Sequence, residues 1–360
     1  MSTSPRFHDL VVARTTPDAP GSVCISLQVP AALRDSFAFE PGQFITVRAQ
    51  IAGQDLRRSY SICSTPQGLH ARGEIDIGVR QVEGGVFSSW ANTQLQAGMT
   101  LACMPPDGRF VVQRPRAIHR VGFAAGSGIT PILSILRHSL ETSAHSRFTL
   151  VYGNRRMAHV MFNEALQDLK DRYTNRLTLI HILSRQAQEV PLLEGRIDAA
   201  KVQALIDAFL PVPSMDEVFV CGPEPMIEAT ESALRQAGVK PERIHSERFT
   251  SLTPARPVPS STAAQPKHSK PITVVLDGKA HVLDMGPHLH VIDAAIEAGL
   301  DVPYSCKAGV CCTCRGKVMQ GTVEMDKNFT LSQAECAQGF VLTCQARATS
   351  ADVVISYDER

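Results

Sequence analysis

The feature that most constrains this chain is the spacing of four cysteines near its C-terminal end. Cys306, Cys311, Cys314 and Cys344 follow the pattern C-x4-C-x2-C-x29-C. Plant-type [2Fe-2S] centres use this kind of spacing, whereas zinc ribbons usually carry two C-x2-C pairs. The loop also contains Gly309 and small side chains, so backbone N–H groups can turn inward toward anionic sulfurs. The pattern predicts that these four cysteines bind a [2Fe-2S] cluster, and it disfavours zinc or unliganded thiols.

Two nearby cysteines are left out of this ligand set. Cys312 lies between two ligands, but the spacing is complete without it. Cys336 falls on a predicted helix, where a cysteine is usually a small buried hydrophobic residue.

Length and charge narrow the classes of protein to consider. A chain of 360 residues suits two or three domains. Its 36 Lys and Arg balance 35 Asp and Glu, so no basic surplus draws it to nucleic acid or anionic lipid. Residues 1–10 lack the apolar stretch of a secretory signal, and no segment is long enough to span a membrane. We expect a cytoplasmic protein whose cysteines hold metal rather than form disulfides.

The hydrophobic pattern changes twice along the chain. Residues 8–112 form short alternating runs, such as QFITVRA and EIDIGVR, which predict an antiparallel β-barrel with one helix near residues 86–95. Residues 118–249 alternate strands with amphipathic helices, which predicts a doubly wound parallel sheet. A stretch rich in Pro, Ser and Ala then predicts a linker. We therefore expect domains over residues 1–114, 115–250 and 271–360, with a linker over 251–270.

Two short motifs occur in the predicted barrel. Arg58-Ser59-Tyr60-Ser61 closes a strand, and a Gly-Gly pair opens the predicted helix. Backbone N–H groups at a helix start can hold a pyrophosphate. By resemblance to flavin-binding motifs of the ferredoxin-NADP reductase family, the candidate cofactor-binding residues here are Arg58, Tyr60, Ser61, Val79, Gly84, Gly85, Val86, Phe87 and Ser88.

Three more motifs follow strands of the predicted parallel sheet, at the edge where such sheets bind ligands. In the segment GSGITP, the glycines let a phosphate approach the backbone, and we expect Thr130 to cap the helix and Pro131 to begin it. A C-G-P segment and a Ser-Arg pair follow two other strands. The candidate residues are Gly126, Gly128, Ile129, Thr130, Ser184, Arg185, Cys221, Gly222 and Pro223.

These motifs resemble known families. The segment PYSCKAGVCCTC resembles the ligand loop of plant and cyanobacterial ferredoxins, and this similarity covers residues 271–360. It implies an α+β domain of the β-grasp type. The R-x-Y-S, G-G-V-F-S, G-x-G-x-T-P and C-G-P motifs resemble the ferredoxin-NADP reductase family. That resemblance implies a flavin-binding barrel and an NAD(P)-binding sheet. The glycine pair and helix favour FAD, and FMN stays open.

The family resemblance implies roles for individual residues. Arg58 would bind a flavin phosphate, Tyr60 would stack on the flavin ring, and Ser61 would hydrogen-bond near its N5 atom. Cys221 would lie beside the nicotinamide, so Tyr60, Ser61 and Cys221 are the candidate catalytic residues. Ser184 and Arg185 would contact the 2′-phosphate of NADPH. Phe249, together with Glu247, would approach the flavin from the end of the nucleotide domain.

The domain order implies an electron-transfer function. A hydride carries two electrons and a [2Fe-2S] cluster takes one, so a flavin is needed between NADPH and the cluster. This order resembles the oxygenase reductases. Segments such as FEPGQFITVRA, LRRSYSIC and CGPEPMIEATESAL are most similar to the reductase subunits of bacterial phenylacetyl-CoA epoxidases. That similarity implies a partner, the di-iron oxygenase of a multicomponent epoxidase in phenylacetate degradation.

Alternatives to this partner remain open. The same machinery could serve another oxygenase or a hybrid-cluster protein, or the cluster could act as a redox sensor. Residues 271–360 carry eleven Asp and Glu against seven Lys and Arg, a net charge of −4. We therefore expect the partner to dock with a basic face.

Overall fold

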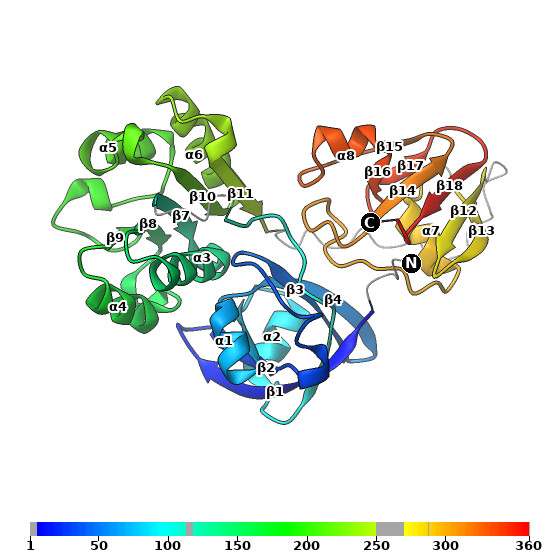
Figure 1. Ribbon diagram of the computed structural model, residues 1–360, viewed down its shortest axis with the longest axis horizontal. Helices are drawn as coiled ribbons and strands as arrows, with labels where there is room; N and C mark the ends of the chain where they lie inside the picture. The colour runs from blue at the N-terminus through cyan, green and yellow to red at the C-terminus, as the bar shows by residue number, and fades with distance from the viewer. Residues whose placement is uncertain (1–5, 113–117, 250–269, 287, 360) are drawn as a thin grey trace.

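The computed structural model of the protein describes residues 6–112, 118–249, 270–286 and 288–359. Three large sheets form three lobes, with the N-terminal lobe lying below the other two in Figure 1. The predicted fold class is confirmed: an antiparallel barrel, a parallel α/β sheet and a smaller α+β domain. The predicted linker over 251–270 lies almost wholly outside the described residues, and the domain boundaries stay predictions.

The N-terminal lobe is a six-stranded antiparallel sheet in the order β4-β3-β6-β1-β2-β5. The sheet curls until its edges meet at a single bridge between Ile62 and Ile77. Its strands are β1 (His8–Pro17), β2 (Ser22–Gln28), β3 (Phe44–Ile51), β4 (Gln54–Ser61), β5 (Glu74–Arg80) and β6 (Thr100–Cys103). Alternate side chains of β5, including Ile75 and Ile77, are fully buried inside the curl, as the period of a strand requires.

This lobe contains two helices where the sequence predicted one. Helix α2 (Val86–Thr93) is the predicted one, and α1 (Pro66–Arg72) was missed. The local signals for α1 were present. Thr65 caps its first turn by accepting a hydrogen bond from the Gly68 backbone, Pro66 is its first residue, and Gly73 ends it with a positive φ of 71°. The sequence prediction relied on the alternating pattern of the flanking strands, and it therefore missed this helix of seven residues.

The second lobe is a parallel sheet in the order β11-β10-β7-β8-β9, with helices on both faces. Its strands are β7 (His119–Ala125), β8 (Arg147–Asn154), β9 (Leu177–Leu183), β10 (Glu217–Gly222) and β11 (Ile244–Arg248). Its helices are α3 (Ile129–Thr142), α4 (Asn163–Arg172), α5 (Ala199–Phe209) and α6 (Glu224–Gln236). Every side chain of β10 is buried, which is typical of a central strand covered on two sides.

The start of α3 corrects a sequence prediction. A short 3-10 turn, η2 (Gly126–Gly128), leads directly into α3, so the helix begins at Ile129 rather than at Pro131. Thr130 lies within the first turn and donates to the backbone oxygen of Ser127 at 3.0 Å instead of capping the helix. The turn and the helix form one continuous coil, which moves the helix start two residues earlier.

The C-terminal lobe has a five-stranded sheet, β13-β12-β18-β14-β16, and a two-stranded sheet, β15-β17. Its elements are β12 (Lys270–Leu276), β13 (Lys279–Met285), α7 (Val291–Glu297), β14 (Arg315–Gln320), β15 (Val323–Met325), α8 (Gln333–Ala337), β16 (Phe340–Leu342), β17 (Ala346–Ala348) and β18 (Val353–Ser356). Asp277 and Gly278 form the predicted turn with φ of 52° and 74°, as a tight hairpin requires. Among the helices in the described ranges, none has the length and apolar character needed to cross a membrane.

Candidate active site

The four predicted cluster ligands converge at one end of the C-terminal lobe. Cys306, Cys311 and Cys314 lie on the loop between α7 and β14, and Cys344 follows β16. The Cys306 thiol lies within hydrogen-bonding reach of Cys311 and Cys344, and Cys344 also reaches Cys314. Three of the four are almost fully buried, and Cys306 is partly exposed. The fold therefore brings together cysteines from two distant segments, as the spacing predicted.

The backbone of this loop favours anionic sulfur. Lys307, Gly309 and Cys312 all have positive φ, with values of 51°, 79° and 56°. Such turns direct successive N–H groups into a concavity that suits anions. The Ala308 N–H donates to the Cys306 sulfur at 3.3 Å. Neighbouring thiols and these backbone donors lower the pKa of Cys306 well below its usual range, and a thiolate is the form that binds iron.

The donor set fits a two-iron cluster. Within the described residues, no three His, Cys, Asp or Glu side chains are grouped as they would be around a single metal ion. A [2Fe-2S] cluster does not need such a group, because each iron takes two cysteine sulfurs. Cys312 is buried, and desolvation raises the pKa of its thiol to about 11, which favours the protonated form. Cys336 lies on α8 as predicted, but it is half-buried rather than buried.

Strand β4 and helix α2 form the predicted flavin site. The ring of Tyr60 packs against that of Phe87 at 5.5 Å, which joins the end of β4 to the first turn of α2. Gly85 precedes α2, and no side chain caps the N–H groups of its first turn. Free N–H groups at a helix start fit a pyrophosphate. At Gly84, with φ of 71°, a Cβ atom would meet nothing within 4 Å, so the backbone there is open to a ligand.

Not every predicted flavin residue can touch a ligand. Val79 is fully buried in the barrel core, which leaves it only a supporting role. Phe87 is also almost fully buried, whereas Val86 is 44% exposed. Ser88 is buried and accepts a hydrogen bond from the Val82 N–H at 3.1 Å, so it shapes the loop before α2. Arg58 is partly exposed beside the site and donates to the Arg57 backbone oxygen at 2.7 Å.

The two nucleotide motifs lie against each other at the edge of the parallel sheet. A Cβ atom on Gly128 would lie 2.1 Å from the backbone oxygen of Cys221, so only glycine allows this contact. Gly126 has φ of 55° and accepts a hydrogen bond from the Tyr152 hydroxyl at 2.9 Å. Ile129 and Thr130 are buried behind the turn. Gly222 ends β10, and Pro223 precedes α6 without a side-chain cap.

Three polar groups from both lobes meet where these motifs face the barrel. The Ser61 hydroxyl donates to Glu247 Oε2 at 2.9 Å, which joins β4 to β11. Glu247 pairs with Cys221 in the sheet register. Desolvation raises the pKa of Glu247 to about 8, and burial beside Glu247 raises the pKa of the Cys221 thiol. Phe249, just beyond β11, is 37% exposed.

The predicted NADPH-selective pair lies at the same sheet edge. Ser184 and Arg185 follow β9, and their backbone N–H groups donate to the backbone oxygens of Asn154 at 2.9 Å and of Arg155 at 2.8 Å. Arg155, Arg156 and Arg185 are all exposed. Sequence reasoning missed Arg155 and Arg156, although they directly follow strand β8 at the ligand-binding edge. The structure thus brings three guanidinium-bearing residues onto adjacent segments.

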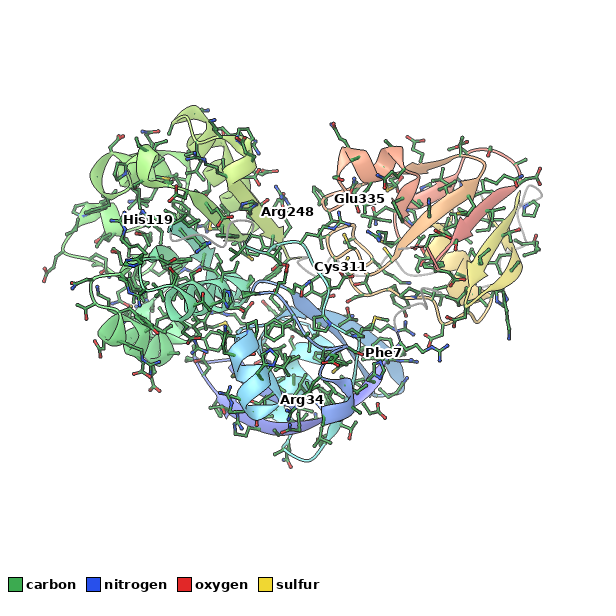
Figure 2. All side chains as sticks on the ribbon, in the orientation of Figure 1. Phe7, Arg34, His119, Arg248, Cys311 and Glu335 are labelled. Atoms are coloured by element: carbon green, nitrogen blue, oxygen red, sulfur yellow. The ribbon has the colours of Figure 1, made fainter. Side chains whose placement is uncertain are left out.

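A small cavity of about 120 Å³ joins the three lobes. Arg109 and Phe110 line it from the barrel lobe, Glu247 from the nucleotide lobe, and Cys311 from the cluster loop. Glu247 and the cluster loop therefore open onto one shared space. Figure 2 shows Cys311 at the junction of the lobes, with Arg248 of the nucleotide lobe and Glu335 of the C-terminal lobe above it in this view.

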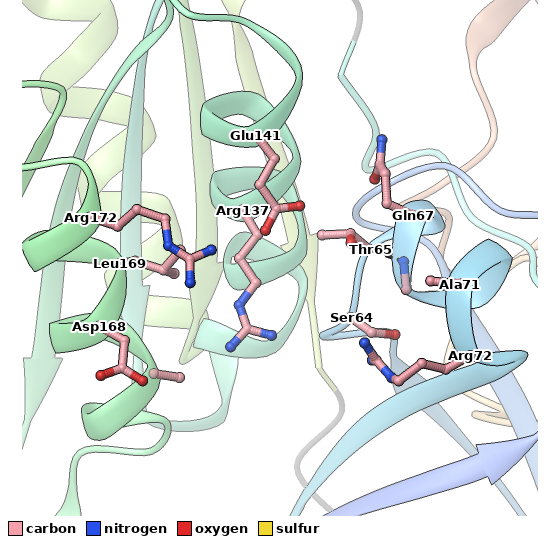
Figure 3. Close-up of a pocket in the computed structure, with 12 residues that line it drawn as sticks. Ser64, Thr65, Gln67, Ala71, Arg72, Arg137, Glu141, Asp168, Leu169 and Arg172 are labelled. Carbon is pink, nitrogen blue, oxygen red and sulfur yellow. Dashed lines mark hydrogen bonds between the residues drawn. The ribbon is translucent and has the colours of Figure 1, made fainter.

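A second cleft, of about 400 Å³, lies between α1 and the helices α3 and α4. Figure 3 shows Arg72, Arg137 and Arg172 around it, with Glu141 and Asp168 among them. None of the predicted site residues lines this cleft. Its acids and bases are mixed, so its charge favours no particular ligand.

Comparison with known families agrees with this arrangement. Residues 22–112 match the oxidoreductase FAD-binding domain, residues 123–232 the oxidoreductase NAD-binding domain, and residues 274–349 the 2Fe-2S iron-sulfur cluster binding domain. The chain therefore carries FAD-binding, NAD-binding and [2Fe-2S] domains in the predicted order.

Two relatives match the chain over almost its whole length. One subunit of the 1,2-phenylacetyl-CoA epoxidase of Escherichia coli (strain K12) is 41% identical over 358 residues, which is 98% of each chain. The 3-ketosteroid-9-alpha-monooxygenase, ferredoxin reductase component, of Rhodococcus rhodochrous is 32% identical, over 97% of this chain and 96% of the relative. Among solved structures, phthalate dioxygenase reductase has the same fold, with a TM-score of 0.59, 21% identity, and coverage of 97% of this chain and 98% of that chain.

Proposed function

Because this chain belongs to the family of oxygenase reductases that includes the Escherichia coli 1,2-phenylacetyl-CoA epoxidase component, we propose that it passes electrons from NADPH to the di-iron oxygenase of a phenylacetyl-CoA epoxidase. The route leads through FAD and a [2Fe-2S] cluster. The 41% identity extends over the ferredoxin domain as well as the reductase domains, which supports an acceptor of the same kind. Dependence on NADPH and on reduced cysteines supports a cytoplasmic location for this work.

The observation that carries the proposal is the convergence of the three predicted sites on one junction. The Ser61–Glu247 hydrogen bond joins the barrel to the nucleotide domain, and the shared cavity leads from Glu247 to Cys311. A bound flavin accepts hydride from NADPH and passes single electrons on, and the cluster carries one electron at a time. This convergence supports a single chain that performs both steps.

The chain's own residues have positioning and proton-handling roles in this proposal. Arg58 and the first turn of α2 would hold the flavin phosphates, and Tyr60 would pack against the flavin ring. The segment 126–130 would hold the pyrophosphate of NADPH, while Cys221, Gly222 and Pro223 would place its nicotinamide near Ser61. Glu247 holds a proton up to about pH 8 and accepts a hydrogen bond from the Ser61 hydroxyl. The four cysteines would hold the cluster, and one of them, Cys311, lines the cavity.

Arg185 supports the preference for NADPH over NADH. A charge-assisted contact to the 2′-phosphate contributes about 1.5 to 3 kcal/mol, or roughly tenfold to a hundredfold in preference. We expect Arg185→Ala to reduce the ratio of kcat/KM for NADPH to that for NADH by this range. Arg155→Ala measures how much its neighbour contributes. Equal values for both nucleotides in the native protein would exclude the preference.

An anaerobic titration followed by reconstitution tests the whole proposal. NADPH is added while flavin and cluster absorbance are recorded, and the oxygenase subunits, phenylacetyl-CoA and oxygen are then supplied. We expect both chromophores to be reduced and phenylacetyl-CoA to be epoxidised. A cluster that NADPH does not reduce would instead indicate a redox sensor.

A second acceptor is a steroid oxygenase, because the 3-ketosteroid-9-alpha-monooxygenase reductase component is similar over 97% of this chain. The same reduced protein is offered each oxygenase in turn. Faster reoxidation by the steroid oxygenase than by the epoxidase would favour this acceptor.

A further inference from the structure

The two faces of strand β4 point toward different redox sites. Arg58 and Tyr60 face the predicted flavin site, while Arg57 and Ser59, which alternate with them, face the ferredoxin domain. Only 5% of the Arg57 side chain is exposed, although it carries a permanent charge. A charged side chain this buried needs specific partners.

Arg57 finds these partners on the segment that leads into the first cluster ligand. It donates to Asp301 Oδ1 at 2.5 Å and to the Val302 backbone oxygen at 3.1 Å. Its guanidinium also lies over the ring of Tyr304, 4.3 Å from the centroid. Cys306 follows two residues later. One arginine of the barrel therefore holds the chain that carries the first cluster sulfur.

A second arginine of the barrel holds the opposite end of the same face. Arg109 forms a two-pronged ion pair with Glu335, the third residue of α8, whose side chain completes a capping box with Ser332. Glu335 also accepts from Arg315 at 3.0 Å, within the ferredoxin domain. Bidentate pairs of this kind specify the geometry of a contact as well as its strength.

Hydroxyl groups adjacent to cluster ligands complete the contact between these ion pairs. Ser59 hydrogen-bonds Ser305 at 2.9 Å, and Thr46 contacts Thr313 at 3.4 Å. Ser305 and Thr313 immediately precede Cys306 and Cys314 in the sequence. The barrel therefore contacts the residues that immediately precede two of the predicted cluster ligands.

We propose that Asp301 and Glu335 form one docking surface that is used twice, first by Arg57 and Arg109 of this chain and then by cationic side chains of the external acceptor. The proposal rests on the proposed function as an oxygenase reductase. Electron transfer rates fall steeply with distance, so the acceptor must approach the cluster from this same face. The two docked states therefore exclude each other. NADPH supplies two electrons and the cluster carries one, so each NADPH requires two release and docking cycles.

The chemistry of the covered face defines the kind of partner. The acceptor must be a protein with two basic side chains placed to reach Asp301 and Glu335, and with small polar groups between them opposite Ser305 and Thr313. The net charge of −4 on residues 271–360 attracts such a face from a distance. A nucleic acid or an acidic protein would be repelled.

The test uses the full holoenzyme with cytochrome c as a basic protein acceptor at low ionic strength. Two variants neutralise opposite sides of the internal contact. Arg109→Met changes only the barrel, and the double variant Asp301→Asn, Glu335→Gln changes only the ferredoxin domain. Glutamine is also accepted at the third position of a capping box, where Glu335 lies, so this double variant keeps the start of α8. Asp284→Asn, on the outer strand β13, is the matched control for lost charge.

Stopped-flow absorbance first measures flavin-to-cluster transfer after mixing with NADPH. We expect this rate to fall in both variants, because both lose internal ion pairs. The KM for cytochrome c is then measured, and it distinguishes the two variants. The double variant raises KM about threefold to tenfold, because the acceptor loses its docking charges. Arg109→Met lowers KM, because the acceptor no longer competes with Arg109 for Glu335.

Opposite shifts in KM support the proposal. It is overturned if the double variant keeps the KM of the native protein and of Asp284→Asn, or if both variants raise KM together. Visible absorbance verifies the cluster, and Glu335→Gln alone replaces the double variant if that variant has lost it. Because cytochrome c is the acceptor, the outcome does not depend on which oxygenase the chain serves. If the epoxidase reconstitution failed, the result of this KM test would therefore still be valid.

Discussion

The barrel meets its two neighbours through junctions of different chemistry. Against the nucleotide domain it packs apolar groups, such as Phe110, whose ring stands perpendicular to that of Phe219 at 5.4 Å, together with a few hydrogen bonds such as that from Ser61 to Glu247. Against the ferredoxin domain it uses arginine ion pairs and hydroxyl groups. Arg109 and Phe110 are neighbours in sequence, yet each belongs to a different junction. Two adjacent residues of the barrel therefore contact different domains.

The difference corresponds to what each junction must do. Hydride transfer requires the flavin site of the barrel and the nicotinamide site of the nucleotide domain to keep a fixed relative position while nucleotides bind and leave, and this junction is tightly packed. The Ser134 hydroxyl on α3 donates to the backbone oxygen of Ser64 at 2.6 Å, and a Cβ atom on Gly78 would lie 2.8 Å from the ring of Phe162. An electron carrier must instead leave one partner for another. Ion pairs exchange with water more readily than buried apolar surface does.

Removing a cluster ligand has the largest expected effect and separates the two halves of the pathway. We expect Cys311→Ser to lose the cluster and to abolish NADPH-dependent cytochrome c reduction. The hydride step does not involve this junction, so reduction of ferricyanide, a small acceptor that takes electrons from flavin, continues. Visible absorbance and the two assays check this. Cytochrome c reduction at the native rate would mean that electrons leave directly from the flavin.

The neighbours Arg109 and Phe110 allow a direct comparison of stability. Phe110→Ala removes a buried ring from the apolar junction and should lower the free energy of unfolding by about 3 to 5 kcal/mol. Arg109→Met removes a partly exposed ion pair and should cost less than about 1 kcal/mol. Denaturant unfolding followed by flavin fluorescence measures both. Equal losses would contradict the view that only one junction is permanent.

Glu247 makes the nucleotide junction sensitive to pH. Its pKa is raised to about 8 in the folded protein, whereas an unfolded carboxyl releases its proton near pH 4.5. Between these values the unfolded state binds fewer protons, so the native protein loses stability relative to Glu247→Gln as pH rises. The slope is at most about 1.4 kcal/mol per pH unit, and the difference becomes constant above pH 8. Thermal unfolding of both proteins between pH 5 and 9 measures this, and parallel curves would refute the raised pKa.

A change in ionic strength has the smallest expected effect. It tests only the junction between the barrel and the ferredoxin domain, which contains the ion pairs. Electron delivery to a basic acceptor should slow severalfold as ionic strength rises through roughly 0.1 M, where the Debye length is about 10 Å. Flavin reduction by bound NADPH should change little over the same range. Stopped-flow measurements at saturating NADPH separate the two steps. A rate of electron delivery that does not change with ionic strength would count against docking through Asp301 and Glu335.

Local sequence determined those features of the protein that depend on how residues are spaced along the chain. The four cysteines, the glycine turns and the alternation of strands and helices predicted three domains in order, because ligand geometry and backbone periodicity act over short stretches. Even the missed helix α1 carried its own signals in Thr65, Pro66 and Gly73. The roles of the individual flavin and nucleotide residues stay predictions.

Tertiary structure alone decided how the domains meet. The R-x-Y-S motif singles out Arg58, but no local pattern shows that its neighbour Arg57 binds Asp301 and Val302 of the ferredoxin domain. The pairing of Glu247 with Ser61, and of Arg109 with Glu335, joins positions separated by 186 and 226 residues. Such contacts depend on the relative placement of whole domains, which the folding of each separate segment does not specify.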